Sequence, residues 1–296
     1  MALKGKAGIL SYSSPQTWEH AIGVPSLALR GWVNTYIGHR ENFRQPVCRL
    51  EVPRPWVVLV LGFGADIGVA PVESQPHFRR YQALVFGLNE KPLLHEVKGL
   101  RSCLEITMPP WTAYQLFDGA LPELAQETVA LDAIWGAEAD QINVQLSELS
   151  SWTERFALVD QILIKKLTTS TSRIRSEVQW AWHQLVAQGG CIAIRHLAQQ
   201  IGWSHRHFAQ CFREQIGITP KIAARQIRFA HAHQMLSRGE EGSLAAIAAE
   251  CGYSDQSHLT REFHLFSGCS PVTYQQAHFP ELPGTPGEIV WNGNLH

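Results

Sequence analysis

The sequence predicts an α+β protein of two domains. A β-rich barrel or sandwich with flanking helices is followed by an all-α domain that holds two helix-turn-helix units. The 296 residues, 45% of them hydrophobic and 17% charged, are typical of a globular chain long enough for two domains. Short β-branched and aromatic runs fill the first part, and one pattern of helix, glycine turn, capped helix and proline occurs twice near the other end.

The first part of the chain contains several short strand-like runs, which Pro, Gly and Asn separate. The expected strands are Val47–Val52, Trp56–Phe63, Gln82–Leu88, Leu93–Val97 and Cys103–Met108. Short strands at near-regular spacing, without helical patterns between them, indicate a small sandwich or barrel. The helices expected to follow are Trp111–Phe117, Glu138–Leu149 and Ser151–Leu167.

The last of these helices begins Ser-Trp-Thr-Glu, which places Ser151 as the N-cap and Glu154 as its capping-box partner. An apolar stripe then recurs at helical spacing: Phe156, Val159, Leu163 and Leu167. Two interpretations of the stripe stay open. It packs on the barrel, or it forms a two-helix contact between protomers.

The repeated pattern occupies residues 197–220 and 247–271. Its two copies match at these pairs, the last three after a slip of one residue: Ala198/Ala248, Gly202/Gly252, Trp203/Tyr253, Ser204/Ser254, Phe212/Phe263, Gly217/Gly268 and Pro220/Pro271. Glycine supplies the turn and a serine is placed to cap the second helix. This arrangement is typical of a helix-turn-helix, which lays its second helix in the major groove of DNA.

Helical spacing divides the second helix of each copy into two faces. Phe208, Cys211, Phe212 and Ile216 face inward in the first copy, and Leu259, Phe263 and Phe266 in the second. The outward residues include Arg and Gln, which can pair bidentately with guanine and adenine. They are His205, Arg206, Ala209, Gln210 and Arg213, then Gln256, Ser257, Thr260, Arg261 and His264. A polar helix face is usually only solvated, but its duplication together with the turns and caps favours a DNA-reading face.

Residues ~171–278 resemble the arabinose-regulator (AraC/XylS) family of bacterial transcription regulators. The most specific match is Gly252-Tyr253-Ser254-Asp255-x-Ser257-x-Leu259-x-Arg261-x-Phe263, which continues through Gly268 to Ser270-Pro271. The resemblance implies seven helices, a long connecting helix at Pro220–Ser237, and recognition helices 204–216 and 254–266 in two successive major-groove segments of double-stranded DNA.

The resemblance also implies which residues contact DNA. Base contacts carry over onto His205, Arg206 and Gln210, and onto Gln256, Ser257, His258 and Arg261. Phosphate contacts fall to Arg213, Lys221, Arg225 and Arg228. Two positions depart from the family, because Gln210 stands where an arginine is usual and His264 where a basic residue is usual. Ten basic and seven acidic residues between 171 and 278 give this region a mild positive bias, although the whole chain carries −1.

The N-terminal part resembles a cupin-like effector domain found in this family, through Pro25-Ser-Leu-x-Leu, Trp56-Val-Val-Leu-Val-Leu-Gly-Phe-Gly and Leu131-Asp-x-Ile-Trp-Gly-Ala-Glu. Aromatic and charged residues beside expected strands are the candidate effector contacts: Trp32, Tyr36, His39, Arg40, Trp111 and Tyr114. The metal-binding cupin pattern is His-x-His followed by a carboxylate. Since His39, His77 and His95 are isolated along the chain, we predict no metal site and no cofactor.

The polar run 168–172 predicts a domain boundary. The expected division is an effector-binding and dimerisation domain at 1–170, a DNA-binding domain at 171–279 and a tail at 280–296. Within the tail, the Ile289–Trp291 run either docks as a strand or stays mobile. The expected partners are promoter DNA, RNA polymerase, a small-molecule effector and a second copy of the chain.

Other classes of protein are disfavoured by what the sequence lacks. There is no G-x-S-x-G elbow, P-loop, dinucleotide fingerprint or H-E-x-x-H, so we expect no enzyme. Neither an apolar run of ~18 residues nor a signal-peptide layout is present, so we expect a cytoplasmic protein without membrane contact. Six cysteines without a C-x-x-C pair indicate reduced thiols. The remaining alternatives are a ligand-independent architectural DNA-binding protein and an enzyme domain fused to a DNA-binding module.

Overall fold

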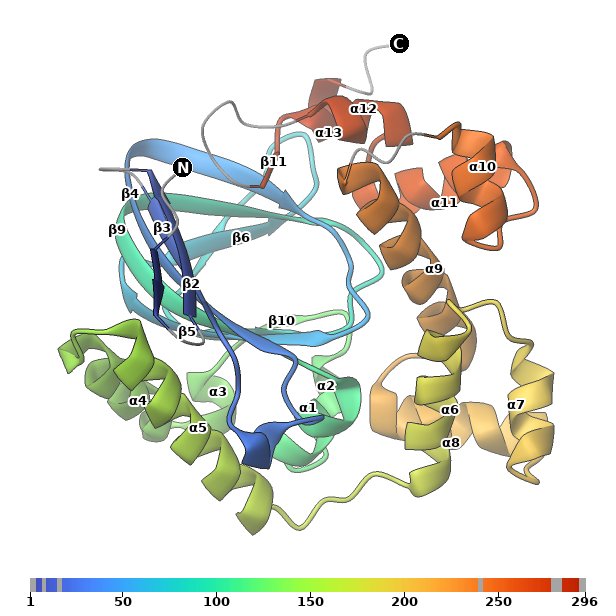
Figure 1. The fold of residues 1–296 in the computed structure, drawn as a ribbon, viewed down its shortest axis with the longest axis horizontal. Helices are drawn as coiled ribbons and strands as arrows, with labels where there is room; N and C mark the ends of the chain where they lie inside the picture. The colour runs from blue at the N-terminus through green and yellow to red at the C-terminus, as the bar shows by residue number, and fades with distance from the viewer. Residues whose placement is uncertain (1–3, 7–8, 15–17, 239–241, 278–283, 293–296) are drawn as a thin grey trace.

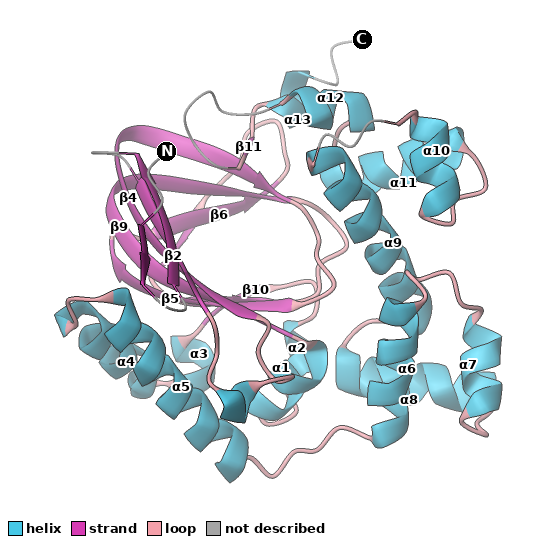
Figure 2. Cartoon of the chain, in the orientation of Figure 1, coloured by secondary structure: helices cyan, strands magenta, loops and turns pink. Residues whose placement is uncertain are grey.

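The computed structural model describes residues 4–6, 9–14, 18–238, 242–277 and 284–292. It shows a curved, barrel-like β-sheet with helices beneath it, and a helical region that runs along one side of the sheet (Figures 1 and 2). The predicted α+β class with a β-rich first part and an all-α second part is therefore confirmed.

The sheet is built mainly from the first 130 residues. Its path is β1-β2-β3-β4-β9-β5-β8-β10, with β6 paired to β9 and β7, and β11 paired to β4. Its strands are β1 (Lys4–Lys6), β2 (Ile9–Ser14), β3 (Trp18–Gly23), β4 (Thr35–Glu51), β5 (Val57–Gly64), β6 (Ile67–Pro71), β7 (Arg79–Tyr81), β8 (Leu84–Phe86), β9 (Leu93–Met108), β10 (Thr128–Ala130) and β11 (Thr285–Pro286).

Two long strands, β4 and β9, form the centre of the sheet and pair antiparallel over most of their length. The predicted runs Leu93–Val97 and Cys103–Met108 are one continuous strand, because β9 continues through Gly99, whose φ is +82°. β4 begins twelve residues before the predicted Val47, and its register with β9 shifts between Phe43 and Val47. This irregularity bends the strand, and the bend helps to curve the sheet.

Helices cover the lower end of the sheet in Figure 1. They are η1 (Leu27–Leu29), α1 (Pro110–Leu116), α2 (Leu121–Leu124), α3 (Asp132–Trp135), α4 (Ala137–Glu148) and α5 (Trp152–Thr169). The capping box of Ser151 and Glu154 is confirmed at the start of α5. The apolar stripe of α5 is buried within the chain, and Phe156 stacks on Tyr36 of β4. Packing on the barrel is therefore confirmed, and the interpretation of this stripe as a contact between protomers is wrong.

The all-α part begins after the polar linker. Its helices are α6 (Ser176–Ala187), α7 (Ile194–Gln200), α8 (His205–Ile216), α9 (Pro220–Ser237), α10 (Leu244–Glu250), α11 (Gln256–Ser267) and α12 (Pro271–Gln276). The long connecting helix spans the predicted residues 220–237. Within the described residues, no helix is both long and apolar enough to cross a bilayer.

The two parts of the chain share a continuous core, in which Trp111 and Leu121 belong to the same apolar cluster as Trp182 and Phe212. The tail contributes as well, since β11 pairs with β4 and α13 (Ile289–Asn292) inserts the buried Val290. Residues 289–292 are thus a short helix and not the strand that was one of the two expectations. Residues 280–283 and 293–296 lie outside the described residues, and the division at 170 and 279 stays a prediction.

Candidate nucleic-acid interface and ligand cavity

The first helix-turn-helix unit is α7 and α8, joined by Gly202 with φ +73°. Ser204 caps α8 by accepting a hydrogen bond from the His207 amide, as predicted. The inward residues Phe208 and Phe212 have no exposed surface. Gly217 ends the helix in the left-handed conformation and lies against Leu121 and Ala125 of the barrel-side helices. The buried side of this unit therefore rests on the N-terminal part, and its other side faces solvent.

The second unit repeats this geometry with α10 and α11 around Gly252, whose φ is also +73°. Here the N-cap is Asp255, which accepts a hydrogen bond from the His258 amide at 2.7 Å. Ser254 lies one residue before the cap and donates to Asp255. The expectation that the recognition helix begins at residue 254 is corrected: α11 begins at Gln256, because Asp255 and not Ser254 caps it.

The structure exposes most of the predicted DNA-contacting side chains. His205, Arg206, Gln210 and Arg213 of α8 are exposed, as are Gln256, Ser257 and Arg261 of α11 and Lys221 at the start of α9. His258 and Thr260 are half-buried, because His258 packs edge-on against Tyr253 and Thr260 bonds to the Gln256 carbonyl. Both recognition helices thus present a continuous polar face to solvent.

Three predicted contact residues already have partners within the protein. Gln210 donates to Glu214 at 2.8 Å, one turn along α8. Arg225 pairs with Glu262 of α11 at 2.7 Å, and Arg228 donates to the Gly190 carbonyl. Sequence alone could not show these partners for the arginines, because Glu262 lies on another helix and Gly190 in the turn after α6. The arginines tie α9 to its neighbours.

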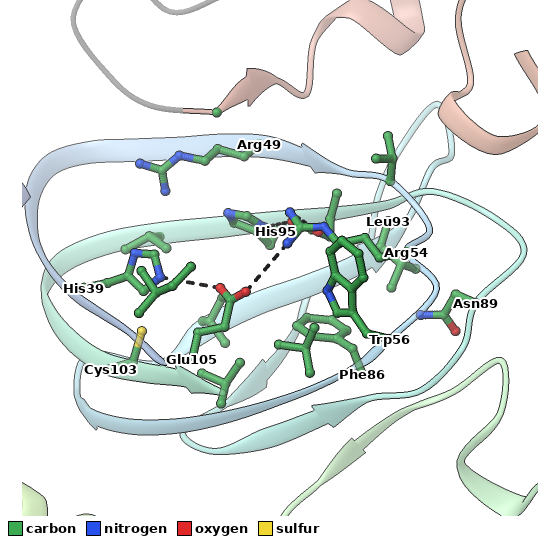
Figure 3. Close-up of a pocket in the computed structure, with 18 of the residues that line it drawn as sticks. His39, Arg49, Arg54, Trp56, Phe86, Asn89, Leu93, His95, Cys103 and Glu105 are labelled. Atoms are coloured by element: carbon green, nitrogen blue, oxygen red, sulfur yellow. Dashed lines mark ion pairs between the residues drawn. The ribbon is translucent and has the colours of Figure 1, made fainter. Parts of the chain in front are cut away.

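The second candidate site is a cavity of about 360 Å³ inside the sheet, within the size range of small-molecule pockets. Side chains of β4, β5, β8 and β9 line it, together with the loop that precedes β9 (Figure 3). Apolar walls include Ile37, Val58, Val60, Ile67, Phe86 and Leu93. Polar groups are His20, His39, Glu41, Arg49, Glu51, Arg54, Trp56, Asn89, Lys91, His95, Arg101 and Glu105.

Of the six predicted effector contacts, only His39 lines this cavity. Tyr36 and Trp111 are core residues, since Tyr36 donates to Asp160 at 2.6 Å and Trp111 packs edge-on against His183. Trp32 and Tyr114 pack partly buried against the same core, and Arg40 is exposed on the outer face of β4. These five are not placed at the cavity, because strand alternation turns Tyr36 and Arg40 away and the others lie outside the sheet interior.

Alternation along the strands would have found the missed residues. His39 and Glu41 are two residues apart on β4, and Arg101, Cys103 and Glu105 follow the same period on β9. Side chains of period two share one face of a strand. The strands expected from the sequence do not include residues 35–46. The alternation that places His39 and Glu41 on the cavity face of β4 was therefore not predicted.

Opposite charges are paired inside the cavity. Arg54 Nη2 lies 2.8 Å from Glu51 Oε1, and its Nη1 lies 3.6 Å from Glu105 Oε1. Arg49 Nη2 lies 2.8 Å from Glu41 Oε1. Burial alone would raise the pKa of both Glu41 and Glu105. Their histidine contacts and the nearby arginine charge outweigh it and lower each pKa to about 2.

Two cavity histidines are held neutral near pH 7. Burial, then the positive charge of Arg49, lowers the pKa of His95 to about 3. Burial also lowers the pKa of His20. The pKa of Glu51 is raised, unlike those of Glu41 and Glu105, because its burial outweighs the attraction of the Arg54 charge.

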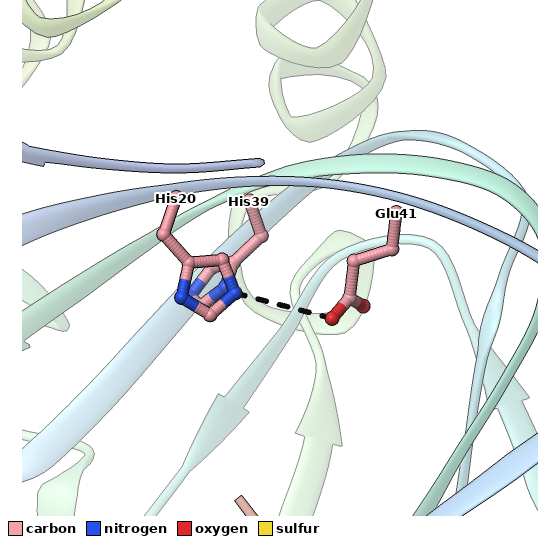
Figure 4. A group of neighbouring side chains, drawn as sticks. All are labelled: His20, His39 and Glu41. Carbon is pink, nitrogen blue, oxygen red and sulfur yellow. Dashed lines mark ion pairs between the residues drawn. The ribbon is translucent and has the colours of Figure 1, made fainter. Parts of the chain in front are cut away.

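One group of cavity residues overturns the view that His39 is isolated. His20 of β3 and His39 of β4 are cross-strand neighbours with ring centroids 4.4 Å apart. One ligand atom from each of them and one from Glu41 all lie within 4.8 Å of one another (Figure 4). The pairing of β3 with β4 creates this group, and β3 was not among the predicted strands.

The cavity wall touches the helical part at two places. Gln226 of α9, which has no exposed surface, donates to the Asn89 carbonyl at 2.6 Å. A side chain at Gly268, the end of α11, would meet Val290 of the tail at 3.0 Å and Pro92 at 3.6 Å. Asn89 and Gly284 themselves line the cavity. Val52, which lines the cavity, belongs to the same apolar cluster as Phe263 and Phe266 of α11. The cavity wall is therefore hydrogen-bonded to α9 and shares a core with the second unit.

Comparison with known proteins supports the identity of the helical part. A family profile described as a helix-turn-helix domain matches residues 197–277. The HTH-type transcriptional regulator Rv1931c of Mycobacterium tuberculosis is 34% identical over 89 residues, which are 30% of this chain and 34% of that protein. The HTH-type transcriptional activator RhaR of Yersinia pseudotuberculosis is 38% identical over 80 residues, 26% of this chain and 27% of its own length.

Solved structures were also found. ToxT from Vibrio cholerae covers 82% of this chain and 98% of its own at 11% identity, with a TM-score of 0.47. The C-terminal domain of AraT, a response regulator from Geobacillus stearothermophilus, covers 38% and 94% at 21% identity, with a TM-score of 0.34. This chain therefore aligns with about a third or less of the length of these two curated relatives. On the profile match and this sequence identity, residues 197–277 are a helix-turn-helix domain.

Proposed function

We propose that the protein is a sequence-specific DNA-binding regulator of transcription. The observation that carries the proposal is the duplicated unit, in which both recognition helices are capped, anchored by buried phenylalanines and polar on the solvent side. Two such helices joined by α9 suit two successive major-groove segments of double-stranded DNA.

Within this proposal the exposed side chains divide into two roles. Arg206, Gln256 and Arg261 read base edges, together with His205, Gln210, Ser257, His258 and Thr260. Arg213 and Lys221 contact phosphates, as do the free amides at the starts of α8 and α11. Arg225 can contact a phosphate only if it first breaks its ion pair with Glu262.

We propose further that a small molecule in the cavity controls DNA binding. The support is the mixed apolar and charged lining, the hydrogen bond of its wall to α9 and the core that it shares with α11. A ligand that shifts the loop around Asn89 would bias the position of α9, which joins the two units. The relative RhaR is named a transcriptional activator. We therefore propose activation in the cytoplasm, with RNA polymerase as a partner and residues 1–170 as the effector-binding and dimerisation domain.

A binding role is proposed in preference to a catalytic one. The cavity carboxylates Glu41, Glu51 and Glu105 each pair with Arg49 or Arg54, so none of them is placed as a free general acid or base. Arg101 Nη2 is buried without a hydrogen-bond partner among the described residues, which suits an occupant that offers an acceptor. An architectural protein that ignores small molecules is the second candidate, and a failure of all ligands to bind the cavity would favour it.

The DNA-binding proposal is tested on the full chain with the DNA upstream of its own gene. Footprinting should show protection of two adjacent groove segments, and Arg206→Ala and Arg261→Ala should lose that protection. Arg44→Ala, an exposed arginine of β4, is the matched control and should keep it. Equal footprints from the wild type and both recognition-helix variants would refute the assignment.

The effector proposal is tested by a thermal-shift screen of the full chain against small metabolites. A true effector should raise the melting temperature of the wild type and leave that of a Trp56→Ala variant unchanged, since Trp56 lines the cavity. A hit that stabilises both proteins equally binds elsewhere and contradicts the cavity assignment.

A further inference from the structure

The cavity contains a cluster of nitrogen and oxygen donors that the DNA-binding role does not use. His20, His39 and Glu41 converge from two adjacent strands, and each offers a ligand atom within 4.8 Å of the other two. In Figure 4 the carboxylate of Glu41 and the two imidazole rings point toward one another. We propose that these three residues bind a divalent first-row transition-metal ion inside the sheet.

The separations between the donors suit one shared ion. Two ligands with bonds of ~2.1 Å at tetrahedral angles lie roughly 3.4 Å apart. His20 Nε2 and Glu41 Oε1 are 4.0 Å apart, and no two ligand atoms of the cluster are more than 4.8 Å apart, so the side chains need to approach by roughly 0.5–1.4 Å. The backbone is already in place, because His20 and His39 are directly paired in the β3–β4 register.

The histidines have buried nitrogens that lie near carboxylates but make no well-formed hydrogen bond in the described part of the chain. His20 Nε2 and His39 Nε2 both lie out of contact with solvent and make no hydrogen bond. Leaving a buried polar atom without a partner costs free energy, which a coordinated ion would recover. This feature separates the cluster from an ordinary buried hydrogen-bond network.

Residues around the cluster are arranged as outer partners of metal ligands usually are. Arg49 donates to Glu41 at 2.8 Å and fixes the position of the carboxylate. Glu105 Oε2 lies 3.4 Å from His39 Nε2, so its negative charge lies beside the cluster and favours a bound cation. Three protein ligands leave a coordination position open toward the cavity, where a cavity ligand could bind the ion.

Imidazole with one carboxylate favours zinc, iron, nickel or copper over calcium or magnesium. The test uses the full chain, stripped with a chelator and then dialysed against Zn²⁺ or Co²⁺. We expect one retained ion per chain, with visible absorption from bound Co²⁺. His20→Gln and His39→Gln should each weaken binding at least ~10-fold. His95→Gln, a buried histidine of the same cavity outside the cluster, should retain the ion.

The proposal fails if the wild type retains no ion, or if the two cluster variants bind it as well as the wild type. It also fails if His95→Gln loses the ion equally, which would place the site elsewhere in the cavity. Circular dichroism confirms that each variant is folded. Glu41→Gln changes the third proposed ligand and should also weaken binding of the ion. The measurement needs neither DNA nor an effector, so its result is independent of the regulatory function.

Discussion

Arg206 and Lys221 are both exposed, but they hold different positions in the DNA-binding part. Arg206 projects from the first turn of recognition helix α8, whereas Lys221 lies at the start of the connecting helix α9. A residue that reads bases contributes to discrimination between sequences, whereas a phosphate contact contributes equally to every sequence.

Arg206→Ala should therefore weaken binding to the specific site by ~1–3 kcal/mol and leave non-specific binding nearly unchanged. Lys221→Ala should weaken both and reduce the slope of log K against log salt by about 1. Fluorescence anisotropy over a salt series measures both quantities. If the two variants reduce specific and non-specific binding in the same ratio, the division into base and phosphate contacts is wrong.

His233 of α9 gives a prediction about pH. Its ring packs near Phe229 and its Nε2 lies 2.7 Å from the Tyr274 hydroxyl. Burial, then the positive charge of Arg54, lowers the pKa of His233 from 6.5 to about 4. Between these values the unfolded chain binds the proton and the folded chain does not, so the free energy of unfolding falls as the pH drops from 6.5 to 4.

Removal of this group should reduce the acid sensitivity of the protein. His233→Gln is expected to lose less stability than the wild type between pH 7 and pH 4, by on the order of 3 kcal/mol. Urea denaturation at both pH values measures the difference. An unchanged pH dependence would show that the pKa of His233 is the same in the folded and the unfolded protein, which contradicts the prediction.

The two helix-turn-helix units have glycine turns with the same backbone conformation but different surroundings. Gly202 and Gly252 share a φ of +73°, where a side chain costs roughly 1–2 kcal/mol. A Cβ at Gly202 would meet nothing within 4 Å, but one at Gly252 would lie 2.2 Å from Cys191 Sγ. The second turn is therefore packed against the end of the loop after α6, whereas the first is open.

Gly252→Ala should accordingly lower the melting temperature more than Gly202→Ala does. Adding Cys191→Ala to the Gly252→Ala variant should restore most of the additional loss in melting temperature. The sulfur atom is the obstacle, whereas Cys191 Cβ lies 3.5 Å from the position of the new Cβ, an ordinary contact distance. Differential scanning calorimetry of the four proteins measures this. Equal losses from the two glycine variants would contradict the predicted clash.

The same elements show what a sequence can and cannot predict. Phe208, Phe212 and Phe263 mark the buried faces of α8 and α11 through helical spacing, so these two helices can be predicted from local sequence. The connecting helix α9 was expected only from the family resemblance. The lining of the cavity, in contrast, depends on which strands pair with each other. His20 meets His39 only through the pairing of β3 with β4, and no local spacing encodes that register.

At the scale of the whole molecule, the barrel and the DNA-binding part are joined beyond their covalent linker. Gln226 of α9 holds the cavity loop through Asn89, and Val290 of the tail packs among residues of the second unit. Coupling between two sites is reciprocal, so DNA binding must act on the cavity as strongly as a cavity ligand acts on DNA binding. This permits a test of communication without knowledge of the effector.

Addition of specific DNA to the full chain should change hydrogen exchange at residues 87–93 and 284–290, which connect the cavity to α9 and α11. Gln226→Ala should diminish the change at 87–93, because the bond to Asn89 is lost, while the Val290 contact preserves the change in the tail. Helix α4, on the far side of the sheet, serves as the internal control and should exchange equally with and without DNA. If DNA leaves hydrogen exchange at residues 87–93 and 284–290 unchanged, as at α4, these contacts do not couple DNA binding to the cavity.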